Sequence, residues 1–193
     1  MTDDIRREAD ARHLRHVEHP THRPLSDDYE FVGLCGEDAL AAFVGGVVDL
    51  TPRSNGDDGK DVTGYFRDGA GATIAVPIDV KTFRKPFNLI VEQGKVRRAA
   101  IYVLASFDDQ SQIAKLLGWE WGSVLAAQPM KDFGKGVVNH FIPKERLRPM
   151  SDLAERLVFH GKCACGAPGL YVRFEGSVKT GKRIWSCHEH RPR

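Results

Sequence analysis

Thr73-Ile-Ala-Val-Pro-Ile-Asp-Val-Lys-Thr82 decides the fold, because its apolar residues alternate with other residues as they do in a half-buried strand. Side chains leave a strand on alternate faces, so Asp79 and Lys81 share one face while Ile78 and Val80 share the other. A carboxylate and an ammonium at the end of a buried strand are costly to desolvate unless they pair or bind a metal. The stretch therefore predicts a strand with one apolar face and one chemical face.

The segments around this strand predict a hairpin within a mixed α/β body. Asp61–Arg67 forms a strand that turns at Asp68-Gly-Ala-Gly71 into the quoted one. Ser111–Leu117 fits either a helix or a strand, and Gly118-Trp119 is expected to end it. Further apolar runs predict strands at Asn88–Val91, Ala99–Ala105 and Val137–Ile142, with the second in the middle of a sheet, and a short strand at Val47–Leu50.

Three helices are expected. Residues 3–18 form a polar helix with acids in its first turn and bases in its last, which agrees with the helix dipole. Gly36–Val44 forms a second helix, in which Glu37 shares a face with Leu40 and Ala41. A short third helix is expected at Trp121–Gln128. Residues 52–59 are rich in Asn, Gly and Asp and are expected to form a loop.

Length and composition limit the class of protein. The chain has 193 residues, 41% of them hydrophobic and 28% charged, as expected for one soluble domain with a small appendage. No apolar run approaches the roughly 18 residues of a membrane span, and the N-terminus has no signal-peptide core, so a cytoplasmic protein is expected. Residues 144–193 hold 11 Lys and Arg against 5 Asp and Glu, whereas residues 1–143 hold 17 against 21. The basic tail suits a polyanion partner, and a solvated surface explains it equally well.

Four charged residues are expected to meet at the hairpin. Glu37 lies on a helix, Asp61 at the head of one strand, and Asp79 and Lys81 on its neighbour. Three adjacent carboxylates repel one another unless a divalent cation neutralises them, and oxygen ligands suit Mg²⁺ or Mn²⁺. A metal-bound water near Lys81 is a usable nucleophile against a phosphate. The arrangement predicts phosphodiester hydrolysis.

The order and spacing of these residues resemble the PD-(D/E)xK nuclease superfamily over residues 31–150. The matching features are the Gly36-Glu37 helix, the Asp of Gly56-Asp-Asp-Gly-Lys-Asp61, and Ile78-Asp-Val-Lys-Thr82, as in small phage and prophage members. The resemblance implies a restriction-endonuclease-like mixed sheet of about four strands flanked by helices. It also implies a Mg²⁺-dependent deoxyribonuclease, which is expected to be an endonuclease. A homodimer is compatible with this function.

The same resemblance assigns roles to the four residues. Asp61 and Asp79 would ligate the metal, Glu37 would bind the metal or a water, and Lys81 would orient the nucleophile. Lys60 stands where the family name has proline, and Asp57 or Asp58 is an alternative ligand to Asp61.

The C-terminus has the layout of a zinc ribbon, a hairpin held by two pairs of metal ligands. Two strand-like runs, Leu170–Phe174 and Lys182–Trp185, lie between Cys163-Ala-Cys165 and Cys187-His-Glu-His190. The preferred zinc ligands are Cys163, Cys165, Cys187 and His190. Cys-x-Cys replaces the usual Cys-x-x-Cys, which leaves His160 or His188 as alternatives. The closed four-ligand site predicts structural zinc, and the basic residues around it could contact a phosphate backbone.

The sequence thus predicts an N-terminal helix or arm at residues 1–30, a nuclease-like domain at 31–155 and a zinc-ribbon tail at 156–193. A nuclease is the preferred function. The alternatives are a non-catalytic nucleic-acid-binding protein on the same scaffold and a protein-interaction module built on the ribbon. Cys35 is expected to be a small buried residue, and Trp119 and Trp121 to pack in the interior, with stacking on an unpaired base as their other use.

Overall fold

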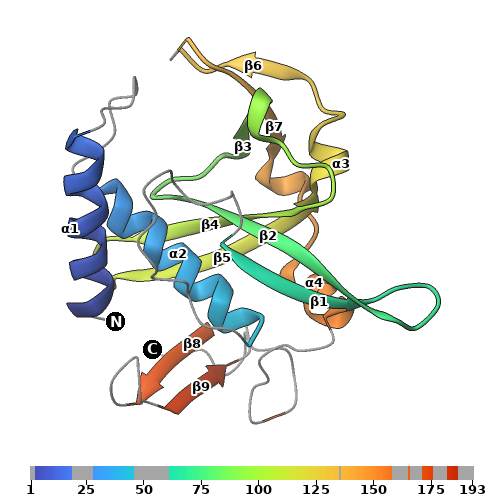
Figure 1. Cartoon of the computed structure of the whole chain (residues 1–193), viewed down its shortest axis with the longest axis horizontal. Coiled ribbons are helices and arrows are strands. Elements are labelled where there is room, and N and C mark those ends of the chain that lie inside the picture. Colours follow the sequence, from blue (N-terminus) through green and yellow to red (C-terminus); the bar gives the residue numbers. More distant parts are fainter. Residues whose placement is uncertain are drawn as a thin grey trace.

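A mixed four-stranded sheet forms the centre of the protein (Figure 1). The computed structural model describes residues 3–18, 28–45, 61–134, 136–157, 165, 171–175 and 182–186 of the chain. The strand order of the central sheet is β1 (Val62–Arg67), β2 (Thr73–Phe83), β4 (Ile101–Asp108) and β5 (Ile113–Trp121). β2 and β4 are parallel, and the other two pairs are antiparallel. The expected mixed α/β class and the central place of the 99–105 run are confirmed.

The β1–β2 hairpin has the turn that the sequence predicts. Asp68 Oδ1 accepts hydrogen bonds from the backbone N–H groups of Ala70 and Ala72 at 2.9 and 2.8 Å. Gly71 adopts a φ of +83°, which suits glycine. Val62 faces Ile78 across the pair and Arg67 faces Thr73, so the register of the hairpin is fixed over its whole length.

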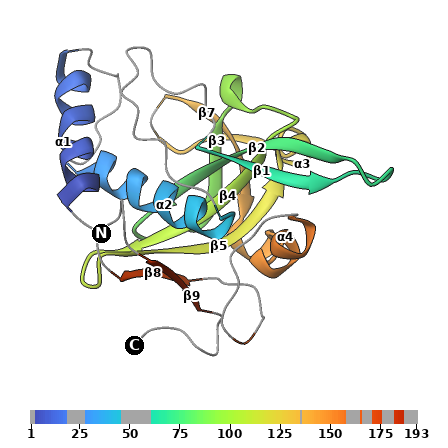
Figure 2. The same ribbon diagram turned by 60° about the horizontal axis from the view of Figure 1, so that its bottom comes forward.

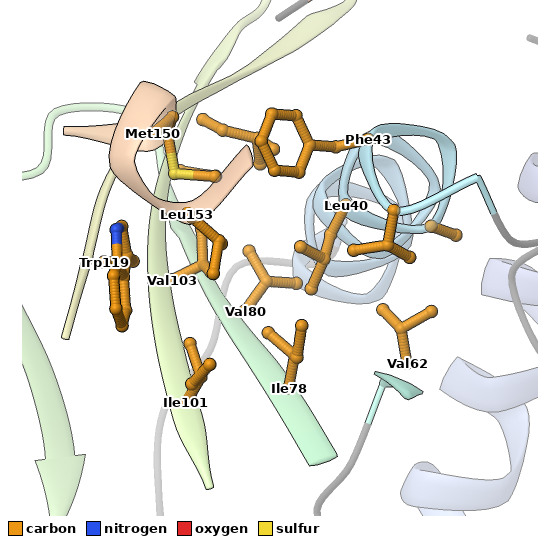
Figure 3. Close-up of a cluster of buried hydrophobic side chains, with 14 of the residues drawn as sticks. Leu40, Phe43, Val62, Ile78, Val80, Ile101, Val103, Trp119, Met150 and Leu153 are labelled. Carbon is orange, nitrogen blue, oxygen red and sulfur yellow. The ribbon is translucent and has the colours of Figure 1, made fainter. Parts of the chain in front are cut away.

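Helices cover one face of the central sheet. α2 (Tyr29–Phe43) and α4 (Met150–Arg156) pack on this face, and α1 (Asp3–Glu18) packs beside α2 (Figures 1 and 2). Alternate residues of β2 and β4 meet the apolar side chains of α2 and α4 in the main core, which includes Leu40, Phe43, Val62, Ile78, Val80, Ile101, Val103, Trp119, Met150 and Leu153 (Figure 3). Ile5 and Ala9 of α1 are buried in the same core.

Helix α2 is longer than predicted, because it begins at Tyr29 rather than Gly36. Phe31, Val32 and Leu34 are all buried. A helix enclosed by a second helix and a sheet is apolar on several sides, so it lacks the one-sided period from which helices are recognised. Cys35 is also buried, as predicted, and burial raises the pKa of its thiol to about 12.

The other face of the central sheet carries a second core and a smaller sheet. β3 (Asn88–Glu92), β7 (Val138–Pro143) and β6 (Met130–Asp132) form this sheet in that order, all antiparallel. The short helix α3 (Gly122–Leu125) and two 3₁₀ turns, η1 (Gln93–Lys95) and η2 (Lys144–Arg146), complete this side. The second core contains Leu89, Val91, Ala100, Tyr102, Leu104, Leu125 and Ile142. The strands at 88–91 and 137–142 are confirmed, but they belong to a sheet of their own.

The ambiguous segment after β4 is one continuous strand. β5 runs from Ile113 through Trp121, so the expected interruption at Gly118-Trp119 is wrong. A Cβ at Gly118 would lie 2.9 Å from the carbonyl oxygen of Arg148, which explains glycine within a strand. Trp119 is fully buried, and its Nε1–H donates to the carbonyl of Pro149 at 3.1 Å. The packing interpretation of Trp119 is therefore confirmed.

A C-terminal antiparallel hairpin is present where the sequence predicts one. β8 (Tyr171–Glu175) pairs with β9 (Lys182–Ser186), and β8 contacts α2. In the described ranges no helix is long and apolar enough to cross a membrane. The expected strand at 47–50 and the loop at 52–59 lie outside the described residues.

Candidate active site

Asp61 connects the start of β1 to β2 just beyond the last residue pair of the two strands. Its backbone N–H donates to the carbonyl of Ile78 at 3.0 Å, and its Oδ2 accepts from the backbone N–H of Val80 at 2.6 Å. Paired residues of the two strands end at Val62 and Ile78, so the carboxylate takes the place of the next backbone acceptor along the ladder. This contact fixes the Asp61 carboxylate beside the Asp79–Lys81 segment.

Asp79 and Lys81 form an ion pair on the face of β2 that points away from α2. Asp79 Oδ1 lies 2.6 Å from Lys81 Nζ. In the parallel register they lie beside Tyr102 and Leu104, two residues of the second core. The Asp79 side chain is only 7% exposed whereas that of Lys81 is 36% exposed. The lysine ammonium is thus the part of the pair that an incoming anion can reach.

The Asp61 carboxyl resists ionisation in its surroundings. Burial raises its pKa well above the ordinary value, and the neighbouring charges of Asp79 and Glu37 raise it further. Lys81 and the Val80 N–H act in the opposite direction but do not offset these effects. The electrostatic interactions of Asp61 therefore connect all four of the residues that the sequence selects.

Glu37 approaches Asp61 from the helical side of the sheet. The preceding residue, Gly36, packs on the end of β2 so tightly that a Cβ there would lie 1.8 Å from Thr82 Oγ1. A residue with a side chain at position 36 would push α2 away from the strand. Gly36 therefore allows α2 to approach β2 closely, and this approach brings the charge of Glu37 near Asp61.

Arg12 holds the Glu37 carboxylate, a contact that sequence reasoning missed. Its Nη1 lies 3.3 and 3.5 Å from the two oxygens of Glu37, and its Nε donates to Glu8 at 3.2 Å. The sequence places Arg12 among the bases of the C-terminal half of a polar helix, where the helix dipole already explains a base. Only the Glu8–Arg12 spacing of four residues carries a local signal.

The donor set fits a hard divalent cation through two of the three predicted carboxylates. Within the described ranges, no three His, Cys, Asp or Glu side chains are grouped so as to hold a metal ion. Asp61 and Asp79 are near enough for the charge of one to oppose ionisation of the other. Mg²⁺ is often held by one or two carboxylates, with waters and substrate phosphates as its remaining ligands. Asp61 and Asp79 are therefore the residues that could hold it.

The predicted zinc site falls almost wholly outside the described residues. Cys163, Cys187 and His190 lie there, as do the alternatives His160 and His188. Cys165 lies in a turn and is exposed. Asp57 and Asp58, the alternatives to Asp61, are also outside the described residues.

Comparison of the chain with protein-family models, curated proteins and solved structures gives no match. The interpretation of the site therefore depends on its own residues and on their geometry.

Proposed function

We propose that this protein is a Mg²⁺- or Mn²⁺-dependent nuclease of the PD-(D/E)xK type that hydrolyses DNA phosphodiester bonds. The observation that supports this most strongly is the half-buried Asp61 carboxyl, hydrogen-bonded to β2 beside the Asp79–Lys81 pair. Lys81 supplies one positive charge for two carboxylates that oppose each other's ionisation, so the second negative charge destabilises the fold unless a further cation neutralises it. A metal site explains why both carboxylates lie at this end of the β1–β2 hairpin.

The residues have separate tasks in this proposal. Asp61 and Asp79 would hold the metal, which when bound supplies positive charge against the phosphate and activates a water. The Val80 N–H fixes the direction of the Asp61 carboxylate. Lys81 lies at the surface of the pair and stabilises the negative charge that develops on the phosphate. Glu37 adds negative charge behind Asp61, which strengthens the affinity of the two carboxylates for a cation.

The C-terminal hairpin is assigned a supporting task. A structural Zn²⁺ bound by Cys163, Cys165, Cys187 and His190 would connect the two ends of the β8–β9 hairpin. Lys179, Lys182, Arg183, Arg191 and Arg193 surround these residues in the sequence. Such a basic tail would contact the phosphate backbone without reading base sequence.

Cleavage of DNA by the purified protein tests the nuclease directly. Linear, circular and branched DNA are incubated with Mg²⁺, with Mn²⁺ and with EDTA. The Asp79→Asn variant keeps the shape of the side chain but removes its charge, and Glu145→Gln, an exposed acid on η2, is the matched control. We expect cutting that requires the metal, is lost in Asp79→Asn and is retained in Glu145→Gln. Cutting by Asp79→Asn at the wild-type rate contradicts the assignment.

A non-catalytic nucleic-acid-binding protein is the second candidate. It is favoured by the absence, among the described residues, of a group of three acids around a metal position, and by the contact of Glu37 with Arg12. This candidate predicts DNA affinity that falls steeply with salt and no cutting of any substrate. A protein-interaction module, in contrast, predicts no such salt-dependent affinity for DNA.

A further inference from the structure

The face of β2 that carries Asp79 and Lys81 continues into an exposed aromatic residue. Phe83 is two positions beyond Lys81, so its side chain leaves the same face of the strand. It is 37% exposed, whereas residues 78–80 of the same strand are buried. On this face of β2, the ring of Phe83 is therefore the next side chain after Lys81.

The loop after β2 presents a second ring with a lysine against it. Phe87 is 72% exposed, the highest exposure of any large hydrophobic side chain in the described ranges. Lys144 Nζ lies 5.9 Å from the centroid of its ring, and the Lys144 N–H donates to the Phe87 carbonyl at 3.0 Å. The backbone of Phe87 is thus fixed by the first residue of η2, and Lys85 in the same loop is also exposed.

A similar pair occurs at the opposite edge of the small sheet. Phe133 follows β6 and is 37% exposed, with Lys131 Nζ 5.5 Å from its ring centroid. Phe141 of β7 supports the ring edge-on at 5.4 Å. β3 and β6 flank β7 (Figure 1). Exposed aromatic residues with adjacent lysines therefore lie beyond both of these neighbouring strands.

We propose that Phe83 and Phe87, with Lys85 and Lys144, form a stacking platform for single-stranded DNA next to the Asp61–Asp79 site, with Phe133 and Lys131 as its extension. Aromatic rings stack on unpaired bases of any sequence, while lysines interact with the phosphates between them. In duplex DNA the base faces are stacked on each other and are not available to a protein ring. Exposed rings alternating with ammonium groups therefore match a single strand better than a duplex or a protein surface.

This inference deepens the proposed nuclease by naming its substrate class, and it rests on that function only for the claim that the bound strand is cut. The sequence suggests stacking only as the second use of Trp119 and Trp121, whose expected role is packing. Trp119 is fully buried. The rings that can reach a base are phenylalanines, whose ordinary interpretation in a sequence is the core.

The test measures DNA binding without added Mg²⁺ or Mn²⁺, so that cleavage does not interfere and zinc is not removed. Fluorescence anisotropy at one fixed salt concentration compares a labelled single strand with a hairpin duplex of the same composition. The variants are Phe87→Ala, Phe87→Trp and the exposed-residue control Ile74→Ala, which lies on the opposite face of β2. We expect Phe87→Ala to weaken single-strand binding by about tenfold with little effect on the duplex. Phe87→Trp should retain the wild-type affinity, since it keeps an aromatic face.

Each outcome distinguishes the platform from the nuclease. No single-strand binding by the wild type, no effect of Phe87→Ala, or an equal loss for duplex and single strand overturns the platform, even if the protein cuts DNA. A selective loss with Phe87→Ala supports the platform even if no substrate is cut, in which case only the catalytic assignment fails. An equal loss in Ile74→Ala marks a general effect on the fold and also overturns the proposal.

Discussion

Arg12 on α1 contacts both carboxylate oxygens of Glu37 on α2, at 3.3 and 3.5 Å from its Nη1. The two side chains are only 20% and 15% exposed. Burial opposes the charge on the guanidinium, yet Glu37, Glu8 and Glu30 outweigh it and raise the pKa of Arg12 above its ordinary value. The N-terminal helix is thus fastened to the element that carries one residue of the candidate site.

Removing Arg12 should cost stability because it leaves Glu37 and Glu8 partly buried without their cation. We expect Arg12→Gln to lower the free energy of unfolding by about 1–3 kcal/mol. The double variant Arg12→Gln/Glu37→Gln should lose less than the sum of the two single variants, since neither partner then remains charged alone. Urea denaturation of the four proteins gives the coupling energy. A coupling energy of zero would show that the contact contributes nothing.

Ionisation of Asp61 should destabilise the metal-free protein. Its pKa is raised in the folded state, so as pH rises from about 4 the unfolded chain loses its proton first and stability falls. We expect Asp61→Asn, which keeps an acceptor for the Val80 N–H, to raise Tm at pH 8 in EDTA by roughly 2–8 °C and to have a smaller effect at pH 4. Differential scanning calorimetry at the two pH values measures this.

Adding Mg²⁺ completes the same experiment. Mg²⁺ should raise the Tm of the wild type at pH 8, because an ion that binds only the folded state stabilises it. The Asp61→Asn variant should show a much smaller increase. If both proteins respond equally to the cation, Asp61 is not one of its ligands.

Much of the core could be predicted from the sequence, because it depends on local patterns. Alternation over 73–82 identifies β2, and the turn residues at 68–71 identify its partner β1. Asp61 and Asp79 then come together because adjacent strands bring their ends together. The small sheet could not be predicted in this way, since β3 pairs with β7, which lies about fifty residues later in the chain, and no local signal links them.

The contacts around Glu37 also exceed what the sequence reveals. Arg12 is separated from Glu37 by 25 positions, and its choice of partner is decided by how α1 packs on α2. Similarly, Phe87 resembles any core phenylalanine until its exposure is known. In both cases the function of the side chain depends on tertiary packing, which residue spacing does not encode.

The close contact of α2 with β2 makes Gly36 sensitive to any side chain. A Cβ at this position would lie 1.8 Å from Thr82 Oγ1, so Gly36→Ala should destabilise the protein by about 1–3 kcal/mol through overpacking. Thr82→Ala removes the clashing oxygen and should restore most of the loss in the double variant. Gly33→Ala is the matched control, since a Cβ there would meet nothing within 4 Å. Equal effects of the two alanines would mean that α2 does not approach β2 as described.

Zinc removal should affect the C-terminal hairpin and leave the central sheet folded. A segment as short as β8–β9 with its flanks has little core, so bound metal would supply most of its folding energy. Elemental analysis should find close to one equivalent of zinc per chain, and Cys187→Ser should lose it. We expect a chelator to make residues 158–193 sensitive to protease while the main thermal transition shifts by only a few degrees. A loss of unfolding free energy in Cys187→Ser as large as that of a core variant such as Leu153→Ala, about 2–5 kcal/mol, would instead assign the metal to the main fold.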